Sequence, residues 1–204
     1  MNIQIINILD YFDYNAFVTL TIFFISLIVL LIDKLCKGLL TKYIFSTERA
    51  SLLNPLTYIR FFTHILGHTD WSHLSNNFLK ILILGPLIEE KYGSTNYLAM
   101  ILITALVVGI FNFIKGNTNL KGASCISFML TVLSAFVNIT EKKFPITLIL
   151  IILFYIIDEI KALRKEDHIS HGSHLIGGLC GAIFGFICIN APLMEIIKDF
   201  FNNL

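Results

Sequence analysis

Six stretches of the chain are long and apolar enough to predict helices that cross a membrane. A bilayer core of about 30 Å needs roughly 20 helical residues, and each backbone polar group must be bonded within its own segment. The stretches that approach or reach this length are residues 15–32, 71–88, 92–114, 122–140, 144–157 and 173–193. Six spans would place both termini on the same side of the membrane.

The connection between the first two stretches, residues 33–70, is too polar to cross a membrane yet contains many apolar side chains. A connection of this length and content is usually structured, and amphipathic helices lying in the membrane interface would suit it. We therefore predict an all-α membrane protein, a six-transmembrane-helix bundle with a long structured first loop, in a single membrane-embedded domain over residues 1–204. No internal repeat is visible, which argues against the inverted repeats of many transporters.

Composition excludes a soluble globular protein and a nucleic-acid binder. Hydrophobic residues make up 56% of the chain and charged residues 14%, whereas an average soluble domain has roughly a quarter of its residues charged. The net charge of +1 lacks the basic footprint of a nucleic-acid-binding surface.

The ends and the cysteines of the chain add two expectations. The amino-terminal stretch has no basic residue before its first apolar run and contains Asp10 and Asp13, so we expect no cleaved signal peptide. The four cysteines form no C-x-x-C pair, and we expect them to be buried fillers rather than disulfides or metal ligands. They are Cys36, Cys125, Cys180 and Cys188.

Polar residues inside the apolar stretches indicate where function lies, because they cost free energy in a membrane. His73, Asn77 and Lys80 follow each other at helical spacing and share one helix face. Ser124 stands at the start of the fourth stretch, and His174 stands at the start of the last one. Catalytic groups, a helix cap and interhelical hydrogen bonds are all possible roles for such residues, and their occurrence in one chain favours catalysis.

A ridge of small residues follows the last of these polar groups. Gly177, Gly181 and Gly185 are spaced by four, a pattern that lets two membrane helices approach closely. His174 lies about one turn before the ridge, on the same side. If the fourth stretch packs on this ridge, Ser124 faces His174, a geometry in which a base can activate a hydroxyl nucleophile.

Several motifs together resemble those of the rhomboid family of intramembrane serine proteases. The stretch TYIRFFTHILGHTDWSHLSNN resembles the family's Arg-aromatic-Thr entry, followed by the spaced residues His68, His73 and Asn77. A Glu-x-x-x-Gly motif begins at Glu89, a Gly-x-Ser motif ends at Ser124, and SHLIGGLCG carries the family's final histidine and small-residue ridge. The resemblance implies a rhomboid-like core over residues 57–193, after a first transmembrane helix at 15–32 and an interfacial loop at 33–70.

The resemblance also implies a role for each matching residue. Ser124 would attack the scissile carbonyl, and His174 would take its proton and pass it to the leaving amine, as a dyad. The side chains of His73 and Asn77, with the Ser124 backbone N–H, would form the oxyanion hole. The supporting positions implied are His68, Gly122 and Phe128, the last where the family has a ring stacked on the imidazole.

The implied activity is that of a serine endopeptidase acting on transmembrane protein substrates in the lipid bilayer. The substrate would be the transmembrane helix of another protein, cut near its membrane boundary. Such a protein needs no cofactor and no metal, and it would be a multi-pass integral protein of the cell membrane.

Two residues depart from the family pattern. Cys125 stands where the family usually has glycine after the nucleophile, and its side chain would crowd the oxyanion hole or the helix contact and reduce activity. Lys80 places a charge inside a span, at a cost of about 2.5–3.5 kcal/mol on insertion scales. We expect this lysine to be neutral or paired with a carboxylate, in a structural role.

Charge bias and family resemblance predict opposite orientations. The loops after the first, third and fifth spans contain ten basic residues, and the opposite side contains four. The positive-inside rule would place the ten in the cytoplasm, together with the active site, whereas most bacterial rhomboids open outward.

Two alternatives stay open. One is a catalytically weak or inactive rhomboid-like pseudoprotease that binds transmembrane helices, which Cys125 favours. The other is a histidine-ligated membrane metal oxidase, because several histidines have helical spacing. These are His64, His68, His168, His171 and His174. The metalloprotease signature H-E-x-x-H is absent.

Overall fold

The structure is a computed structural model, and it describes residues 13–116, 119–137 and 171–190 together with a few positions between 146 and 157. Its named elements are α1 (Phe17–Leu35), α2 (Leu39–Tyr43), α3 (Pro55–Thr63), a 3₁₀ turn (His64–Leu66), α4 (Trp71–Tyr92), α5 (Ser94–Lys115), α6 (Ser124–Ser134) and α8 (His171–Asn190). Within this part of the chain, β pairing is limited to one bridge between Thr47 and Leu120. The predicted all-α class is confirmed for these residues.

Three of the described helices are long and apolar enough to cross a membrane: α1, α5 and α8 up to Cys188. Helix α4 has the same length as α5, 22 residues, but it carries Lys80 and several charges in its last turn. Helix α6 has 11 residues and ends at Ser134, well short of the predicted span 122–140. The predicted fifth span, 144–157, lies largely outside the described residues. The count of six spans therefore stays a prediction.

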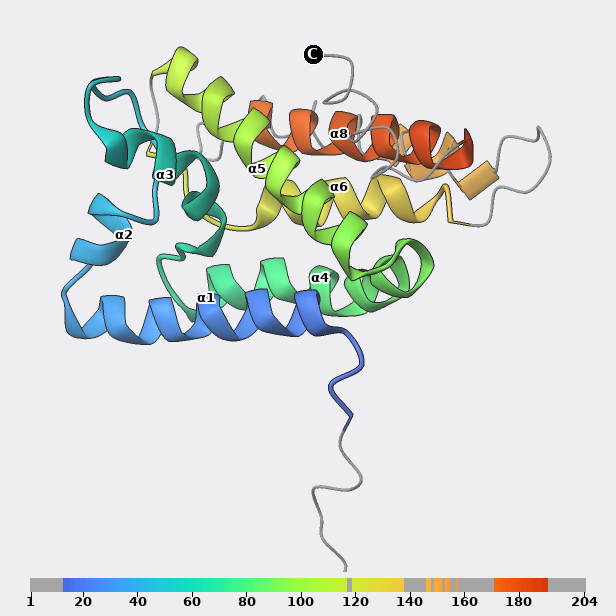
Figure 1. Cartoon of the computed structure of the whole chain (residues 1–204), viewed down its shortest axis with the longest axis horizontal. Coiled ribbons are helices and arrows are strands. Elements are labelled where there is room, and N and C mark those ends of the chain that lie inside the picture. The colour runs from blue at the N-terminus through green and yellow to red at the C-terminus, as the bar shows by residue number, and fades with distance from the viewer. Residues whose placement is uncertain are drawn as a thin grey trace, which may run out of the picture.

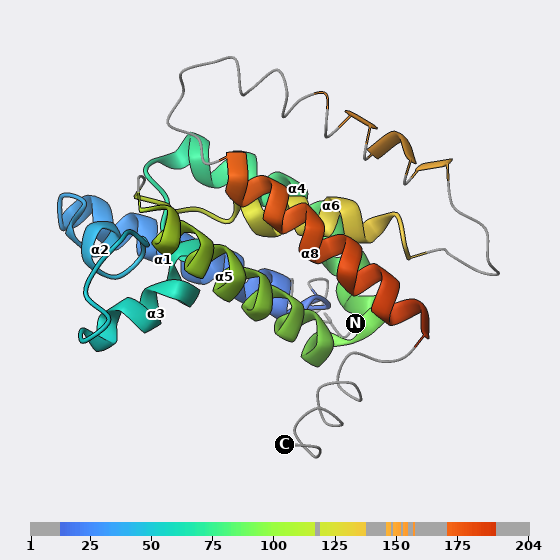
Figure 2. The ribbon, with the colours of Figure 1, turned by 90° about the horizontal axis from the view of Figure 1, so that it is seen from above.

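Helix α6 lies at the centre of the bundle. It packs against α8 and against α4, while α1 packs against α4 and α5 packs against α3 and α8. Figure 1 shows α1 at the bottom of the view with α4 above it, α6 and α8 in the upper half, and α5 crossing in front of them, and Figure 2 shows α8 running alongside α6. Leu74 and Phe78 of α4 and Met129 and Leu130 of α6 are almost completely buried at these contacts.

The small-residue ridge of α8 packs on the backbone of α6. A side chain at Gly177 would overlap the Cys125 carbonyl, and one at Gly181 would overlap the Met129 carbonyl. Backbone contact this close is what small residues permit. The fourth apolar stretch is thus the helix that packs on this ridge, which is the condition under which Ser124 faces His174, and the close approach sets the distance between the first turns of the two helices.

A buried carboxylate fixes the start of α1 to the turn between α4 and α5. Glu89 accepts hydrogen bonds from the backbone N–H groups of Val18 at 2.8 Å and Thr19 at 3.0 Å, and from the Ser94 hydroxyl at 2.7 Å. The first N–H groups of a helix have no intrahelical acceptor and lie at the positive end of its dipole. Glu89 therefore satisfies donors that would otherwise be buried without a partner. Gly93, with a φ of 80°, supplies the left-handed turn that follows.

The first loop, residues 33–70, is folded as predicted. The Arg60 side chain is buried and donates from Nε to the Tyr43 carbonyl at 2.7 Å. Thr47 and Leu120 exchange backbone hydrogen bonds of 2.8 and 2.9 Å. The loop is thereby fastened to the segment that leads into α6.

Candidate active site

Ser124 and His174 meet at the amino-terminal ends of two packed helices. Ser124 is the first residue of α6 and His174 lies in the first turn of α8. The distance from Ser124 Oγ to His174 Nε2 is 3.0 Å, which is within hydrogen-bond reach. Both side chains are only partly buried, so a substrate can approach them. This arrangement can transfer a proton from a hydroxyl to an imidazole.

An aromatic ring lies against the imidazole. The centroids of the Phe128 and His174 rings are 4.4 Å apart with an interplanar angle of 32°, a separation typical of aromatic packing. Phe128 is one turn after Ser124 on α6 and is partly buried. Its ring restricts the orientations open to the imidazole.

Two side chains of α4 converge on the turn before Ser124. Gly122 has a φ of 104°, and a side chain there would collide with His73 Nε2 and Asn77 Nδ2. Asn77 Nδ2 is buried and has no hydrogen-bond acceptor among the residues that the structure describes. The backbone N–H of Ser124 is in the first turn of α6, where N–H groups lack an intrahelical acceptor. His73 Nε2 and Asn77 Nδ2 converge on the turn that precedes the Ser124 N–H, and together these three groups are a candidate cluster of donors to a developing negative charge.

The beginning of α4 sets the position of His73. Asp70 is the N-cap of this helix and accepts from the His73 backbone N–H at 2.9 Å, which lowers the pKa of the Asp70 carboxyl. The Thr69 hydroxyl lies 2.9 Å from Asp70 Oδ2 and 3.1 Å from His73 Nδ1. A hydroxyl has one hydrogen to donate, so it can donate to the carboxylate or to the imidazole.

Two histidines of the first loop hold the turn that precedes Ser124. The Gly122 N–H donates to the His64 carbonyl at 2.9 Å, and the Ala123 N–H donates to His68 Nε2 at 3.4 Å. His68 Nδ1 lies 3.2 Å from the Leu66 carbonyl, so the tautomer with hydrogen on Nδ1 satisfies both contacts. The imidazole of His64 lies 3.0 Å from the Ala105 carbonyl through Nε2.

Both of these histidines are uncharged at neutral pH. They are completely buried, and burial lowers the pKa of each to about 4. Removal from water disfavours the imidazolium form. His64 Nε2 and both ring nitrogens of His68 contact backbone groups, whereas His64 Nδ1 has no hydrogen-bond partner among the described residues. The described residues contain no cluster of three potential metal ligands. His168, one of the histidines of the metal alternative, lies outside the described residues.

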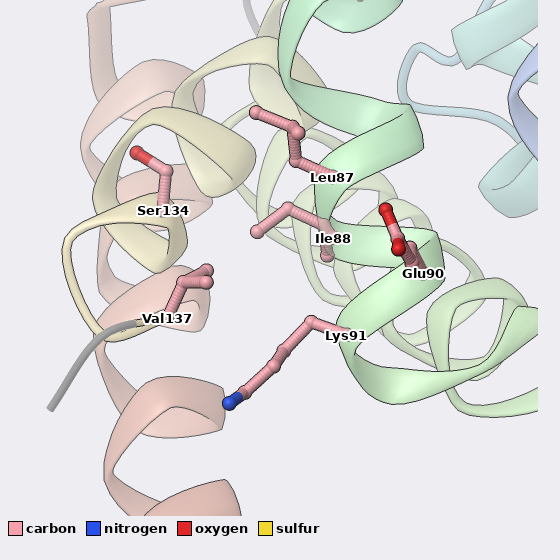
Figure 3. A pocket seen from close by; sticks show the side chains of 6 residues that line it. All are labelled: Leu87, Ile88, Glu90, Lys91, Ser134 and Val137. Carbon is pink, nitrogen blue, oxygen red and sulfur yellow. The ribbon is translucent and has the colours of Figure 1, made fainter. Parts of the chain in front are cut away.

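Cys125 does not enter the donor cluster formed by His73, Asn77 and the Ser124 N–H. Its side chain is buried in the hydrophobic core together with Cys180, and Gly177 of α8 leaves room beside its backbone. A separate hollow of about 530 Å³ lies at the other ends of α4 and α6, where Figure 3 shows Lys91 extending from α4. Ser124 does not line this hollow.

All seven residues expected at the site lie close to the start of α6. Ser124, His174 and Phe128 form one group, and His73 and Asn77 meet at Gly122, with His68 behind this turn. Their catalytic roles stay predictions. Thr69 and Asp70 were not singled out from the sequence, although an aspartate directly before a predicted helix is a common N-cap signal.

A comparison with protein families matches this chain to the model of the Rhomboid domain over residues 55–191. The matched range contains every residue of the candidate site.

Two curated relatives are similar over most of the chain. Rhomboid-like protein 11, chloroplastic, of Arabidopsis thaliana is 23% identical over 158 residues, which cover 70% of this chain and 56% of that protein. Rhomboid protease GluP of Bacillus subtilis (strain 168) is 27% identical over 153 residues, which cover 74% of this chain and 30% of that protein. The aligned region thus spans 56% of the first relative and 30% of the second.

Proposed function

Because the chain belongs to the rhomboid family of membrane proteins, we propose that it is an intramembrane serine endopeptidase with a Ser124–His174 dyad. The observation that carries this proposal is the distance of 3.0 Å between Ser124 Oγ and His174 Nε2 at the ends of two helices. The substrates are transmembrane segments of other membrane proteins, cleaved within or next to the bilayer. The named relative GluP, described as a rhomboid protease, supports the same activity.

The first half of the reaction forms an acyl-enzyme. Ser124 Oγ attacks the scissile carbonyl carbon while its proton passes to His174 Nε2. The carbonyl oxygen becomes an oxyanion, which accepts hydrogen bonds from His73 Nε2, Asn77 Nδ2 and the Ser124 N–H. The carbon–nitrogen bond then breaks, and His174 returns the proton to the departing amine.

The second half of the reaction uses water in the same way. His174 Nε2 removes a proton from a water molecule, and the resulting hydroxide attacks the acyl carbon. The ester bond breaks, the Ser124 oxygen takes the proton back from the imidazole, and the carboxyl product leaves. Partial exposure of Ser124 and His174 provides the route by which water reaches the acyl group.

The proposal is tested by cleavage of a model transmembrane substrate in liposomes. Wild-type protein should cut it, whereas Ser124→Ala and His174→Ala should each lower turnover by a factor of at least about 10³. Asn77→Ala should retain the dyad and lose about 10²–10³ in turnover, the usual cost of one oxyanion donor. Equal cleavage by the wild type and the two dyad variants would refute the assignment.

A pseudoprotease that binds transmembrane helices without cutting them is the second candidate. Cys125, in place of the family's glycine, is the observation in its favour. Burial of this side chain in the core supports the protease instead, because the oxyanion donors are left uncrowded. A fluorophosphonate that labels the wild type and spares Ser124→Ala would support the protease, and substrate binding without labelling would support the pseudoprotease.

The partners of the protein follow from the same proposal. The lipid bilayer surrounds a multi-pass bundle, and the three apolar helices α1, α5 and α8 supply much of the surface that faces it. We place the protein in the cell membrane, with no cofactor required for the reaction.

A further inference from the structure

Lys80 is a charged residue in the middle of α4 that the proposed reaction does not use. Its ammonium group lies 5.1 Å from the centroid of the Phe128 ring. A cation within about 6 Å of an aromatic ring centroid is attracted by the electron-rich face of the ring. The expectation from the sequence is a lysine that is neutral or paired with a carboxylate, and the partner that the described residues provide is this aromatic ring.

Phe128 connects this cation to the candidate dyad. Its ring lies against the imidazole of His174, with 4.4 Å between the centroids, and His174 Nε2 lies 3.0 Å from Ser124 Oγ. The contacts thus run without a gap from Lys80 on α4, through Phe128 on α6, to His174 on α8. The His171 ring also meets the imidazole edge-on, with 6.3 Å between the centroids, but Phe128 is the nearer ring, so a shift of the Phe128 ring would change the orientation of the imidazole.

The Lys80 side chain is exposed at the surface of α4, where a cation–π contact is weaker than at a desolvated position. Its place on the helix favours the contact, because Lys80 follows Asn77 by one turn and its ammonium reaches the Phe128 ring of α6. The cation–π attraction therefore stabilises the ammonium group against the Phe128 ring and offsets part of the cost of a charge inside a membrane.

We propose that Lys80 is a positioning residue for the dyad, which fixes the Phe128 ring and through it the orientation of the His174 imidazole. This inference rests on the proposed function, and it assigns to the unusual lysine a role in the alignment of the base.

Two substitutions of Lys80 distinguish the effect of the side chain's charge from the effect of its length. Lys80→Met keeps the length of the side chain and removes the charge, whereas Lys80→Arg keeps a cation that can lie on an aromatic face. We expect Lys80→Met to lower kcat and the rate of Ser124 labelling by a fluorophosphonate by about two- to fivefold. KM should change little, and Lys80→Arg should be close to wild type. The matched control is Lys91→Met, at the far end of α4, which should leave both rates unchanged.

A double-mutant cycle tests whether Lys80 acts through Phe128. In the Phe128→Leu background, Lys80→Met should have no further effect, because the ring that the cation holds is gone. An equal loss in both backgrounds would overturn the proposal, as would a Lys80→Met protein as active as the wild type.

A second readout does not depend on cleavage. In protein with ¹⁵N-labelled histidine, Lys80→Met should shift and broaden the imidazole signals of His174 while those of the buried His64 and His68 stay in place. Unchanged His174 signals would overturn the proposal. If wild-type protein neither cleaves nor labels while these signals move, the proposed function fails, whereas the effect of Lys80 on the orientation of the His174 imidazole is still supported.

Discussion

At the scale of single residues, the direction of one hydrogen bond decides whether His73 can serve in the oxyanion hole. A neutral imidazole carries hydrogen on one nitrogen only, so a donor at Nε2 requires Nδ1 to accept. The Thr69 hydroxyl, 3.1 Å from Nδ1, supplies the donor for Nδ1 when it turns away from Asp70. The proposed role of His73 therefore requires the arrangement in which Thr69 donates to the imidazole.

Removal of this hydroxyl should weaken catalysis without unfolding the protein. Thr69 is exposed, so Thr69→Val is expected to fold normally, and a lost hydrogen bond of this kind corresponds to a decrease in kcat of up to about tenfold. Thr69→Ser keeps the hydroxyl and is the matched control. The measurement is turnover of a model substrate, and equal turnover in Thr69→Val and Thr69→Ser would contradict the prediction.

At the scale of helices, the contact between α6 and α8 sets the geometry of the dyad. Ser124 and His174 lie at the starts of these two helices, and the glycines of α8 let the backbones approach. A displacement of about 1 Å between reacting groups can cost about 10² in rate. The ridge is therefore part of the geometry that the proposed reaction requires, although none of its residues touches a substrate in that reaction.

Gly181→Ala tests this dependence. The added methyl group would overlap the Met129 carbonyl and push the helices apart, with an expected cost in stability of about 1–3 kcal/mol and a loss in kcat of up to about 100-fold. Leu179→Ala alters an exposed side chain of the same helix and should have a small effect. The measurements are the Tm in detergent and turnover. Normal turnover in Gly181→Ala would show that the spacing of α6 and α8 at Gly181 does not control the geometry of Ser124 and His174.

The sequence predicts contacts that repeat at helical spacing and misses those made once over long distances. The spacing of His73 and Asn77 placed them on one face of α4, and the spacing of the glycines indicated a close helix partner. The hydrogen bond from the Ala123 N–H to His68 joins residues 55 positions apart, and no local sequence pattern predicts it. The contact of Lys80 with Phe128 was missed for the same reason, since its sequence signal is only an unexplained charge.

The ends of helices were predicted less well than their existence. The fourth apolar stretch continues to residue 140, yet α6 ends at Ser134. Apolar composition alone does not mark where a helix stops, because residues after the helix can be apolar as well. Lys37, with a φ of 54° just after α1, is a further turn that the sequence does not signal.

At the scale of the whole molecule, stability should depend on pH through two buried histidines. The pKa of His64 and that of His68 are lowered from 6.5 to about 4 by burial. The unfolded chain therefore binds protons that the folded protein excludes as the pH falls below 6.5. The stabilisation is complete above pH 6.5 and is lost progressively toward pH 4.

The expected slope is at most about 2.7 kcal/mol per pH unit for the two groups together. The Tm in detergent should fall between pH 7 and pH 5.5, a window in which carboxylates with ordinary pKa values of about 4 stay ionised. His68→Gln removes one of the two titrations and should flatten the dependence. A constant Tm across this window in the wild type would contradict the assignment of both histidines as buried and neutral.

The hydrogen bonds from the start of α1 to Glu89 have a consequence for biosynthesis. Val18 precedes its acceptor Glu89 by 71 residues. At a translation rate of about 5–20 residues per second, the ribosome adds Glu89 roughly 4–14 seconds after Val18. During that interval the first N–H groups of α1 must be solvated by water or lipid headgroups. Helix α1 is therefore synthesised first but can adopt its final position only after the last turn of α4, which carries Glu89, has been synthesised. The order of synthesis thus differs from the order of assembly.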